Sequence, residues 1–379
     1  MKKLLKKTTA VIVCASLITG CPAILAAARS EPVPQISDPL FTGEEPAVAD
    51  ESAAEEADTE TVENWYDRDP IETNVHFAQQ IIEASDAYYG PADQQGSLSY
   101  FSYTTKNYDG DDSEEEKYAV VYTPYGYDAS SQYDIMYLMH GVYGYAEIFL
   151  GYPGEETEMK NCIDHMIEEG MIRPMIIVCM SYYDNNEQEI NDNEDADITK
   201  AFSQEFQNDL MPAVESSYST YAASTSKEDL AASRDHRIFA GFSMGGVTTW
   251  YAFMQSMSYC RYYLVMSGML YWGPDAPADP NGSWSGQMLS NALRSQGYGK
   301  NDFYIYMATG GYDEAKPFLE SQIKSMKKKG KAFTFGSPFD QDVNCTYAYS
   351  EYEDHSWAAV FQYLYNGLPV ISKKIDERG

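Results

Sequence analysis

The chain has 379 residues, with 58 Asp and Glu against 26 Lys and Arg, so its formal net charge at pH 7 is −32. A polyanion of this size excludes ordinary nucleic-acid binding, because contacts to phosphate need clustered Lys and Arg. The basic cluster at Lys324–Lys331 has the pattern of a solvated helix end. The length suits a single α/β domain with long loops.

Residues 1–28 have the pattern of a secretory signal. The basic stretch MKKLLKK is followed by a short apolar run and then by small residues, which together are too short for a stable membrane span. Ala26–Ala28 fits cleavage that releases the chain, whereas Ile18–Cys21 resembles a lipobox that would leave a lipid anchor on Cys21. Because Pro22 is unfavourable directly after a lipidated cysteine, we favour simple secretion, while a lipid anchor at the cell surface stays open.

A region of unusual composition follows at 29–64. Residues 31–64 contain eleven acidic residues and no Lys or Arg. Such a segment cannot bury enough apolar surface to offset its loss of conformational entropy, so the composition predicts a disordered linker. We expect residues 65–379 to form one folded domain, since the sequence has no evident internal repeat.

From residue 97 onward, two kinds of strand pattern are evident. Residues 97–103 and 117–124 are rich in aromatic and β-branched residues and flank a polar segment, which predicts an antiparallel pair with its hairpin loop. Short continuous apolar runs are typical of parallel strands that are buried on both faces. They occur at 133–141, 175–181, 236–241, 262–268 and 303–310.

Amphipathic patterns separate these runs. In residues 200–218, Phe202, Phe206 and Leu210 recur every four residues and form one apolar stripe of a helix. Similar patterns occur at 247–257, 316–328 and 356–368. Strands that alternate with helices predict an α/β fold, with a doubly wound, mostly parallel sheet, antiparallel N-terminal strands and helices on both faces.

The sequence GFSMGG at 241–246 has the G-x-S-x-G pattern. It follows one predicted strand and opens a predicted helix, and chemistry gathers at the carboxyl ends of strands in such sheets. A nucleophilic serine at this turn needs an unusual backbone conformation, and a side chain beside it would clash, which explains the flanking glycines. We therefore identify Ser243 as the candidate nucleophile.

A serine hydroxyl needs a base that a third group orients. In this architecture the chain order is serine, acid and histidine, and His355 is the one histidine of five that follows Ser243. Asp313 is the favoured acid, because it lies just past the predicted strand at 303–310 and can reach a histidine in a neighbouring loop. The alternatives are Glu314, which is a close rival, and then Asp340 and Asp342.

An oxyanion hole needs two backbone N–H groups aimed at the developing negative oxygen. We expect one from Met244, directly after the nucleophile. We expect the other from the loop after an early strand, HGVYG, where Val142 is the first choice and Tyr143 the second. His140 is expected to brace this loop rather than to act as a base.

Four blocks carry these motifs: YLMHGVYG, GFSMGGVTTWYAF, FYIYMATGGYDEA and DHSWAAVFQYLYNGLP. They resemble the feruloyl and acetylxylan esterases of carbohydrate esterase family one, an esterase D-like branch of the α/β hydrolases, over roughly residues 97–370. The resemblance implies an α/β-hydrolase fold and metal-free ester hydrolysis by a triad of Ser243, Asp313 and His355. It also implies oxyanion donors at Val142 and Met244. The tyrosine in HGVYG departs from the family pattern, because many relatives carry a second glycine there, and it would narrow the mouth of the pocket.

Aromatic residues after a strand end are candidates for substrate contact. Tyr271, Trp272 and Trp284 would stack on sugars or on a phenolic acyl group, or else pack their own loop, and Tyr143 is a fourth candidate. The acidic loop at 184–197 has oxygen ligands suited to Ca²⁺ but lacks the glycine and spacing of an EF-hand, which favours a solvated loop.

The cysteines indicate no metal site, and we expect neither a metal nor another cofactor. Beyond the signal, the four cysteines show no metal-type spacing, and a disulfide among them is left open. These cysteines are Cys162, Cys179, Cys260 and Cys345.

Together these features predict a secreted serine esterase that removes feruloyl or acetyl groups from plant cell-wall xylan, with an acylated polysaccharide or oligosaccharide as its partner. Two alternatives stay open. One is an esterase or acyltransferase for another acyl compound, such as a siderophore ester. The other is a surface glycan-binding protein that kept the fold and lost catalysis, although an intact triad argues against it.

Overall fold

The computed structural model describes residues 73, 75–183, 195–270 and 284–378. The signal predicted at 1–28 and the linker predicted at 29–64 lie outside the described residues, as do most of the acidic loop at 184–197 and the aromatic residues Tyr271 and Trp272. In the described part, no helix is long and apolar enough to cross a bilayer. Its four cysteines are buried free thiols, so the disulfide that the sequence leaves open is not formed among them.

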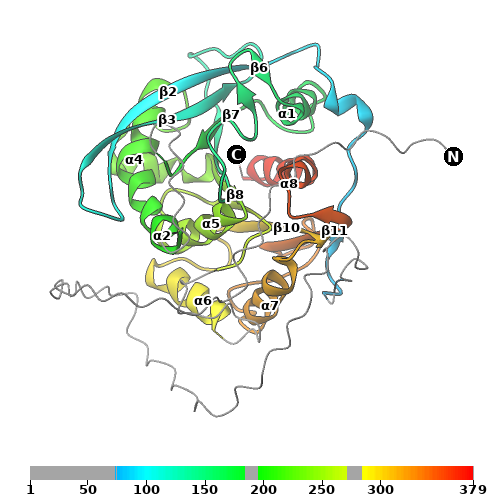
Figure 1. Cartoon of the computed structure of the whole chain (residues 1–379). Helices are drawn as coiled ribbons and strands as arrows, with labels where there is room; N and C mark the ends of the chain where they lie inside the picture. The colour runs from blue at the N-terminus through cyan, green and yellow to red at the C-terminus, as the bar shows by residue number, and fades with distance from the viewer. Residues whose placement is uncertain (1–72, 74, 184–194, 271–283, 379) are drawn as a thin grey trace, which may run out of the picture. The chain divides into compact units, whose positions relative to one another are not determined.

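Within the described residues, nine strands form one sheet, in the order β1-β11-β10-β9-β8-β4-β7-β3-β2 (Figure 1). These strands are β1 (Gln79–Gln80), β2 (Ser97–Lys106), β3 (Glu114–Thr123), β4 (Asp134–Met139), β7 (Met175–Met180), β8 (Arg237–Phe242), β9 (Tyr262–Met266), β10 (Tyr304–Tyr312) and β11 (Cys345–Asp354). A separate antiparallel pair consists of β5 (Gly151–Tyr152) and β6 (Glu155–Glu156). Neighbours from β1 to β7 in this order are parallel, whereas β3 is antiparallel to both β7 and β2. The predicted sheet, mostly parallel with antiparallel N-terminal strands, is confirmed.

Helices cover both faces of this sheet, as the sequence predicts (Figure 1). On one face α1 and α8 pack together, and on the other α5 packs between α2 and α6, with α7 beside α6. The helices are α1 (Glu158–Glu168), α2 (Asp195–Glu205), α3 (Met211–Ser217), α4 (Lys227–Ala232), α5 (Met244–Gln255), α6 (Ser285–Ser295), α7 (Lys316–Lys327) and α8 (Trp357–Asp376). Shorter turns are η2 (Asp86–Tyr89), the π-helical η3 (Phe206–Leu210) and η4 (Arg234–His236).

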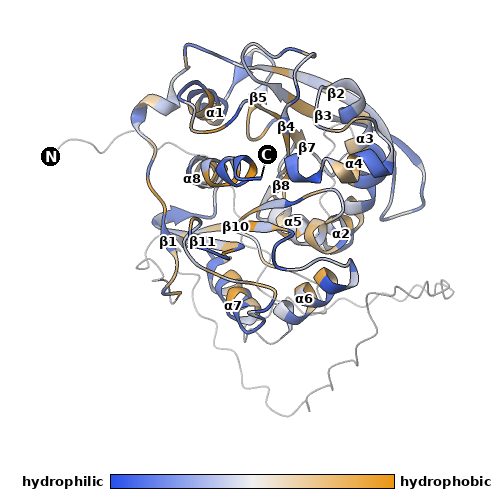
Figure 2. Ribbon diagram, turned by 180° about the vertical axis from the view of Figure 1, so that it is seen from behind, coloured by the Kyte–Doolittle hydropathy of each residue, from blue (hydrophilic) through white to orange (hydrophobic). Residues whose placement is uncertain are grey.

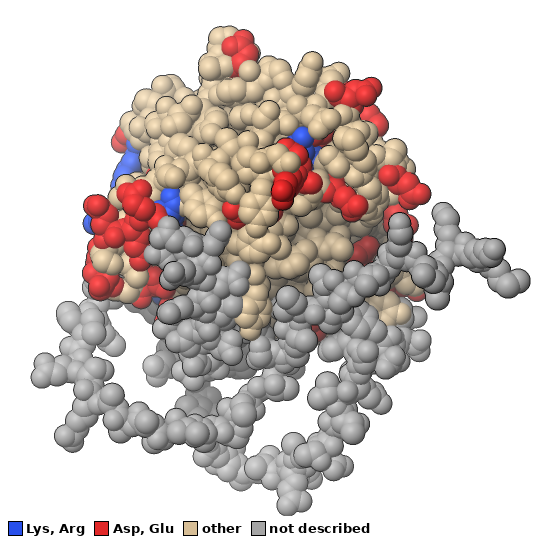
Figure 3. Space-filling view, turned by 45° about the horizontal axis from the view of Figure 1, so that its top comes forward, with Lys and Arg blue, Asp and Glu red and all other residues tan. Residues whose placement is uncertain are grey.

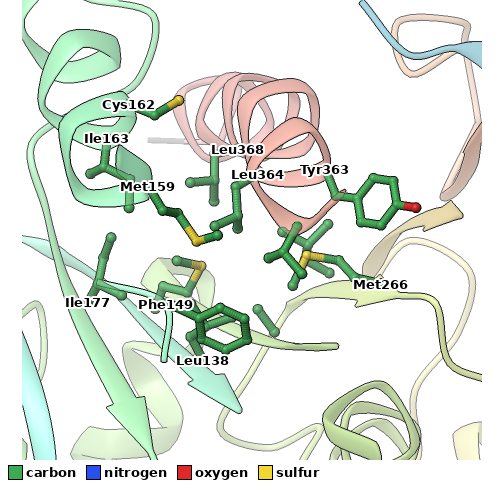
Figure 4. Packing of buried hydrophobic residues seen from close by; sticks show 14 of the residues in the cluster. Leu138, Phe149, Met159, Cys162, Ile163, Ile177, Met266, Tyr363, Leu364 and Leu368 are labelled. Carbon is green, nitrogen blue, oxygen red and sulfur yellow. The ribbon is translucent and has the colours of Figure 1, made fainter. Parts of the chain in front are cut away.

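Apolar side chains fill the layer between the sheet and the helices α1 and α8. Leu364 and Leu368 lie one turn apart on α8 and point toward Met159 of α1 (Figure 4). All three are at most 7% exposed. Burying each such side chain stabilises the fold by about 1.5–3 kcal/mol. Figure 2 shows hydrophobic residues concentrated in the central strands. This layer fixes α8, and with it the residues just before α8, against the sheet.

The sequence patterns do not predict β11, because Thr346 and Ser350 interrupt its apolar residues. Thr346 is nevertheless fully buried, since its hydroxyl accepts a hydrogen bond from Tyr304 Oη at 2.8 Å and donates to the carbonyl of Gly336 at 3.2 Å. As a consequence, His355 directly follows a strand of the sheet, where the sequence indicates only a polar loop.

The helix predicted at 200–218 is divided into three parts, with the π-helical η3 between α2 and α3. The basic cluster is a helix end, as predicted, because Lys324 and Lys327 lie in the last turn of α7. On the face shown in Figure 3, Asp and Glu are more abundant than Lys and Arg, in agreement with the strongly negative net charge.

Candidate active site

Ser243 lies in the sharp turn between β8 and α5. Its backbone has φ 56° and ψ −118°, and such a conformation costs a non-glycine residue about 1–3 kcal/mol. A Cβ on Gly241 would lie 2.9 Å from Cα of Gly245, and a Cβ on Gly245 would lie 2.8 Å from the carbonyl carbon of Met139. The turn therefore has no room for a side chain at either glycine, and it holds the serine at the carboxyl end of β8.

Ser243, His355 and Asp313 form one hydrogen-bonded chain. Nε2 of His355 lies 2.7 Å from Oγ of Ser243, and Nδ1 of His355 lies 2.8 Å from Oδ1 of Asp313. Because the carboxylate of Asp313 accepts a hydrogen bond, Nδ1 carries the ring proton and Nε2 is left to accept the proton of the serine hydroxyl. The structure thus brings together the three residues that the sequence selects, from the ends of β8, β10 and β11.

Asp313 is completely buried. Its Oδ2 accepts a hydrogen bond from the hydroxyl of Thr309 at 3.0 Å, and its Oδ1 accepts one from the N–H of Ala315 at 2.8 Å. Burial opposes ionisation of this carboxyl, but the charge of His355 and the hydrogen bonds from His355 and Ala315 outweigh burial and lower the pKa of Asp313. Asp313 is therefore a rigid, ionised partner for the imidazole.

His355 lies among acids and one aromatic ring. The ring of Phe242 lies 4.9 Å from the imidazole, centroid to centroid. Burial lowers the pKa of His355, but the charge and hydrogen bond of Asp313, followed by the charges of Glu314 and Asp354, raise it from 6.5 to about 8. The surroundings of His355 thus favour the protonated ring, which is the form that exists after it has taken a proton from serine.

The loop after β4 lies against the nucleophile. The N–H of Gly144 donates to the carbonyl of Gly141 at 3.1 Å, which closes a turn with Tyr143 at its third position and with φ 61° at that residue. A positive φ at the third position of a turn favours glycine, so Tyr143 holds a backbone conformation that residues with a side chain rarely adopt. A Cβ on Gly141 would lie 3.0 Å from Cβ of Ser243, so this turn is in close contact with the serine.

Both predicted oxyanion donors are near this contact. Met244 is the first residue of α5, and the N–H groups in the first turn of a helix have no partner within that helix. The helix dipole also favours negative charge at this end. Val142 lies inside the Gly141–Gly144 turn and is 5% exposed. The arrangement can therefore present two backbone donors beside Oγ of Ser243.

His140 braces the same loop from behind. It is completely buried, with Nδ1 at 2.7 Å from the carbonyl oxygen of Gly141 and Nε2 at 3.1 Å from Oγ of Ser181. Burial lowers the pKa of His140 to about 4, although the hydrogen bond with Gly141 opposes this shift. The ring is therefore neutral at ordinary pH and holds the loop in place.

The other candidates from the sequence are one aromatic residue for substrate contact and three acids. Trp284 directly precedes α6, and its carbonyl accepts the N–H groups of Gln287 and Met288, so its part in substrate binding stays a prediction. Asp342 pairs with Lys300 at 3.3 Å, in the segment before β11 and away from the carboxyl ends of the strands. Asp340 also lies in the segment before β11. An oxygen of Glu314 lies within 4.8 Å of a ring nitrogen of His355, but Asp313 is the acid that forms the hydrogen bond with the ring.

One group of metal-type donors occurs among the described residues. An oxygen of Asp313, an oxygen of Glu314 and a ring nitrogen of His355 lie within 4.8 Å of one another. Both nitrogens of His355 already have partners, however, in Asp313 and Ser243. The ring nitrogens that a metal ion would need are therefore engaged in hydrogen bonds.

Two residues that support the site are not predicted from the sequence. Thr309 binds Asp313 from within β10, four residues earlier in the chain. Its position at a strand end beside the candidate acid is the signal that could have found it. Phe242, between the glycine and the serine of the motif, packs on His355, and no sequence signal points to that contact.

Comparison with known proteins identifies the family of this chain. The Esterase family model, described as "Putative esterase", matches residues 113–368. The chain is 35% identical over 294 residues to endo-1,4-beta-xylanase Y of Acetivibrio thermocellus, an alignment that covers 77% of this chain and 24% of the xylanase. The chain thus spans about a quarter of the length of that relative.

Solved structures agree. The feruloyl esterase module from Clostridium thermocellum, a serine-to-alanine mutant complexed with sinapinate, is 32% identical with a TM-score of 0.65, and the match covers 79% of this chain and 96% of the module. A carbohydrate esterase family one ferulic acid esterase from Anaeromyces mucronatus, in complex with ferulic acid, has a TM-score of 0.52 at 16% identity, with 76% and 95% covered, and shares the fold. The chain therefore belongs to the Esterase family, and it is a carboxylic ester hydrolase with the α/β-hydrolase fold of the feruloyl esterases.

Proposed function

We propose that this protein hydrolyses feruloyl or acetyl esters on xylan, with Ser243 as nucleophile, His355 as base and Asp313 as orienting acid. The observation that carries the proposal is the 2.7 Å distance between Nε2 of His355 and Oγ of Ser243. The 32% identity to a feruloyl esterase module in complex with sinapinate supports an aromatic acyl group. The 35% identity to a xylanase supports xylan as the carrier of that group.

In the proposed acylation step, Oγ of Ser243 attacks the ester carbonyl carbon while Nε2 of His355 takes the hydroxyl proton. The carbonyl oxygen becomes an anion, which the N–H groups of Val142 and Met244 stabilise. One such donor contributes roughly a factor of 10² to 10³ to the rate. Asp313 keeps the imidazole in the required tautomer and stabilises its positive charge.

The tetrahedral intermediate then collapses. The bond to the sugar oxygen breaks, and His355 gives its proton to this leaving alcohol, which frees the polysaccharide hydroxyl. The acyl group stays on Ser243. Water then attacks the acyl-enzyme while Nε2 accepts one of its protons, and release of the acid restores the serine hydroxyl.

We also propose that the esterase acts outside the cell. The basic, apolar and small-residue stretches of residues 1–28 support export, and the lipobox-like Ile18–Cys21 leaves open a lipid anchor at the cell surface. Polymeric xylan is an extracellular substrate, which agrees with export. Mass spectrometry of the mature N-terminus tests this directly: a free N-terminus near Ala28 supports simple secretion, a lipidated Cys21 supports anchoring, and an intact Met1 on the mature protein contradicts export.

Product release from feruloylated, acetylated arabinoxylan tests the substrate. Wild type, Ser243→Ala and the exposed-serine control Ser216→Ala are compared, and chromatography quantifies ferulate and acetate. Serine-dependent ferulate release supports a feruloyl esterase, and acetate alone supports a deacetylase. Full release by Ser243→Ala contradicts the proposal, as does cleavage of small aryl or siderophore esters without release from the polysaccharide. Glycan binding without reaction would support a binding protein instead.

A further inference from the structure

A second carboxylate lies beside the catalytic histidine. Glu314 follows Asp313 directly, and one of its carboxylate oxygens lies within 4.8 Å of both a carboxylate oxygen of Asp313 and a ring nitrogen of His355. Asp313 is buried, and Glu314 and His355 are partly buried. Partial burial weakens solvent screening, so a charge at this distance acts strongly on the ring.

The groups next to Glu314 in the chain have other partners. The lysine closest to it in sequence, Lys316, forms an ion pair with Glu320 at 3.1 Å on the next turn of α7. Thr309 and the N–H of Ala315 bind Asp313. The interaction that links the Glu314 carboxylate to the site is that of its charge with the ring of His355.

The charges of Glu314 and His355 each shift the pKa of the other group. The charge of Glu314 contributes to the raised pKa of His355, after the larger effects of burial and of Asp313. Burial raises the pKa of Glu314, and the charge of His355 opposes this rise. The other acid that acts on the ring is Asp354, the last residue of β11. Acids therefore act on His355 from the ends of two neighbouring strands, because Asp313 and Glu314 directly follow β10.

We propose that Glu314 is a positioning residue of this esterase, a second carboxylate that stabilises the imidazolium of His355 together with Asp313. The inference rests on the triad mechanism proposed above. In that mechanism the ring gains a proton at Nε2 while Nδ1–H remains bound to Asp313. The negative charge of Glu314 then lowers the energy of the charged ring without touching the substrate.

This role determines the direction in which removing the charge of Glu314 shifts the pH profile. The base must be neutral in the free enzyme, so kcat/KM rises with pH through the pKa of His355. Removing the charge of Glu314 makes the imidazolium less stable. The acidic limb of the profile must therefore move to lower pH, and the plateau at high pH must fall, because the ring is then a weaker base.

The experiment measures kcat/KM from pH 5 to 10, with chromatographic detection, in wild type and in Glu314→Gln. The substrate is methyl ferulate, or an aryl acetate if the wild type cleaves only acetyl esters. The midpoint of the acidic limb is expected to fall by about one pH unit. Glu314→Asp keeps the charge and is expected to have a midpoint close to that of wild type. Glu228→Gln, which neutralises an exposed acid on α4, controls for net charge and is expected to keep the wild-type profile.

A structural role for Glu314 lowers the rate without moving the midpoint. An unmoved midpoint in Glu314→Gln, or equal midpoints in Glu314→Gln and Glu314→Asp below that of wild type, overturns the inference. If Glu314→Gln does not fold, Glu314→Ala serves as the second neutral variant and must show the same downward shift. Ser243→Ala separates the two proposals: activity of this variant overturns the triad, whereas an inactive Ser243→Ala with an unmoved Glu314→Gln midpoint overturns the role of Glu314 alone.

Discussion

Gly245 lies against the main chain of Met139, so closely that a Cβ on Gly245 would lie 2.8 Å from the carbonyl carbon of Met139. The two residues belong to the start of α5 and the end of β4, and β4 is the neighbour of β8 in the sheet. This contact sets how near the oxyanion loop, which follows β4, approaches the serine, which precedes α5. The glycine of the motif therefore positions two parts of the site at once.

Gly245→Ala is expected to disturb both parts. Backbone must move to make room, since the neighbouring atoms are main chain, and such overpacking costs typically about 1–3 kcal/mol. A displacement of about 1 Å at the serine lowers kcat/KM by about 100-fold. Urea unfolding and ester hydrolysis check both effects. Gly330→Ala is the matched control, because the nearest atom to its new Cβ is 3.6 Å away, and a control as damaging as Gly245→Ala would contradict the account.

Asp313→Asn is expected to reduce kcat by roughly 10⁴-fold, because an amide cannot hold the ring in the tautomer that accepts the serine proton. The measurement is steady-state hydrolysis of a soluble ester. Asp342→Asn, at an exposed acid that pairs with Lys300, is expected to retain wild-type kcat. The assignment of the acid would be wrong if Asp342→Asn lost activity and Asp313→Asn kept it.

The pH profile of the wild-type enzyme reports the state of His355. The pKa of His355 is raised to about 8, so the neutral, active base becomes predominant only above that pH. We expect kcat/KM to fall about tenfold for each pH unit below this value. A midpoint at or below the ordinary histidine value of about 6.5 would show that the surrounding acids do not stabilise the charged ring.

His140 is expected to make the fold sensitive to acid. Its pKa falls from 6.5 to about 4 on burial, so the unfolded chain binds a proton between these values and the folded chain does not. Stability is therefore lost as the pH falls through this window, by up to about 3 kcal/mol. Denaturant unfolding at pH 7 and at pH 4.5 measures the loss. In His140→Asn the loss should be smaller, and equal losses in both proteins would refute this origin.

The strands with continuous apolar runs are predictable from sequence because helices cover both of their faces. The strands β4, β7, β8, β9 and β10 have this pattern, and the structure confirms all five. β11 lacks a continuous apolar run, because Thr346 lies within it. Thr346 can be buried there because its hydroxyl forms hydrogen bonds with Tyr304 and Gly336. Those partners lie far from Thr346 in sequence or in an irregular segment, so no local pattern reveals them.

In the candidate site, too, some residues are predictable from the sequence and others are not. The motif and the chain order select Ser243 and His355, because few residues satisfy them. Choosing between Asp313 and Glu314 is harder, since adjacent residues at a strand end face different directions. Only the tertiary structure shows that Asp313 makes the hydrogen bond while Glu314 lies nearby.

Labelling with a fluorophosphonate probe, followed by peptide mapping, tests whether Ser243 is the nucleophile. We expect one covalent adduct, on Oγ of Ser243, with ester hydrolysis lost in proportion to the fraction labelled. His355→Ala should label far more slowly, because the hydroxyl then has no base. Hydrolysis that continues unchanged after Ser243 is fully labelled would show that another residue is the nucleophile.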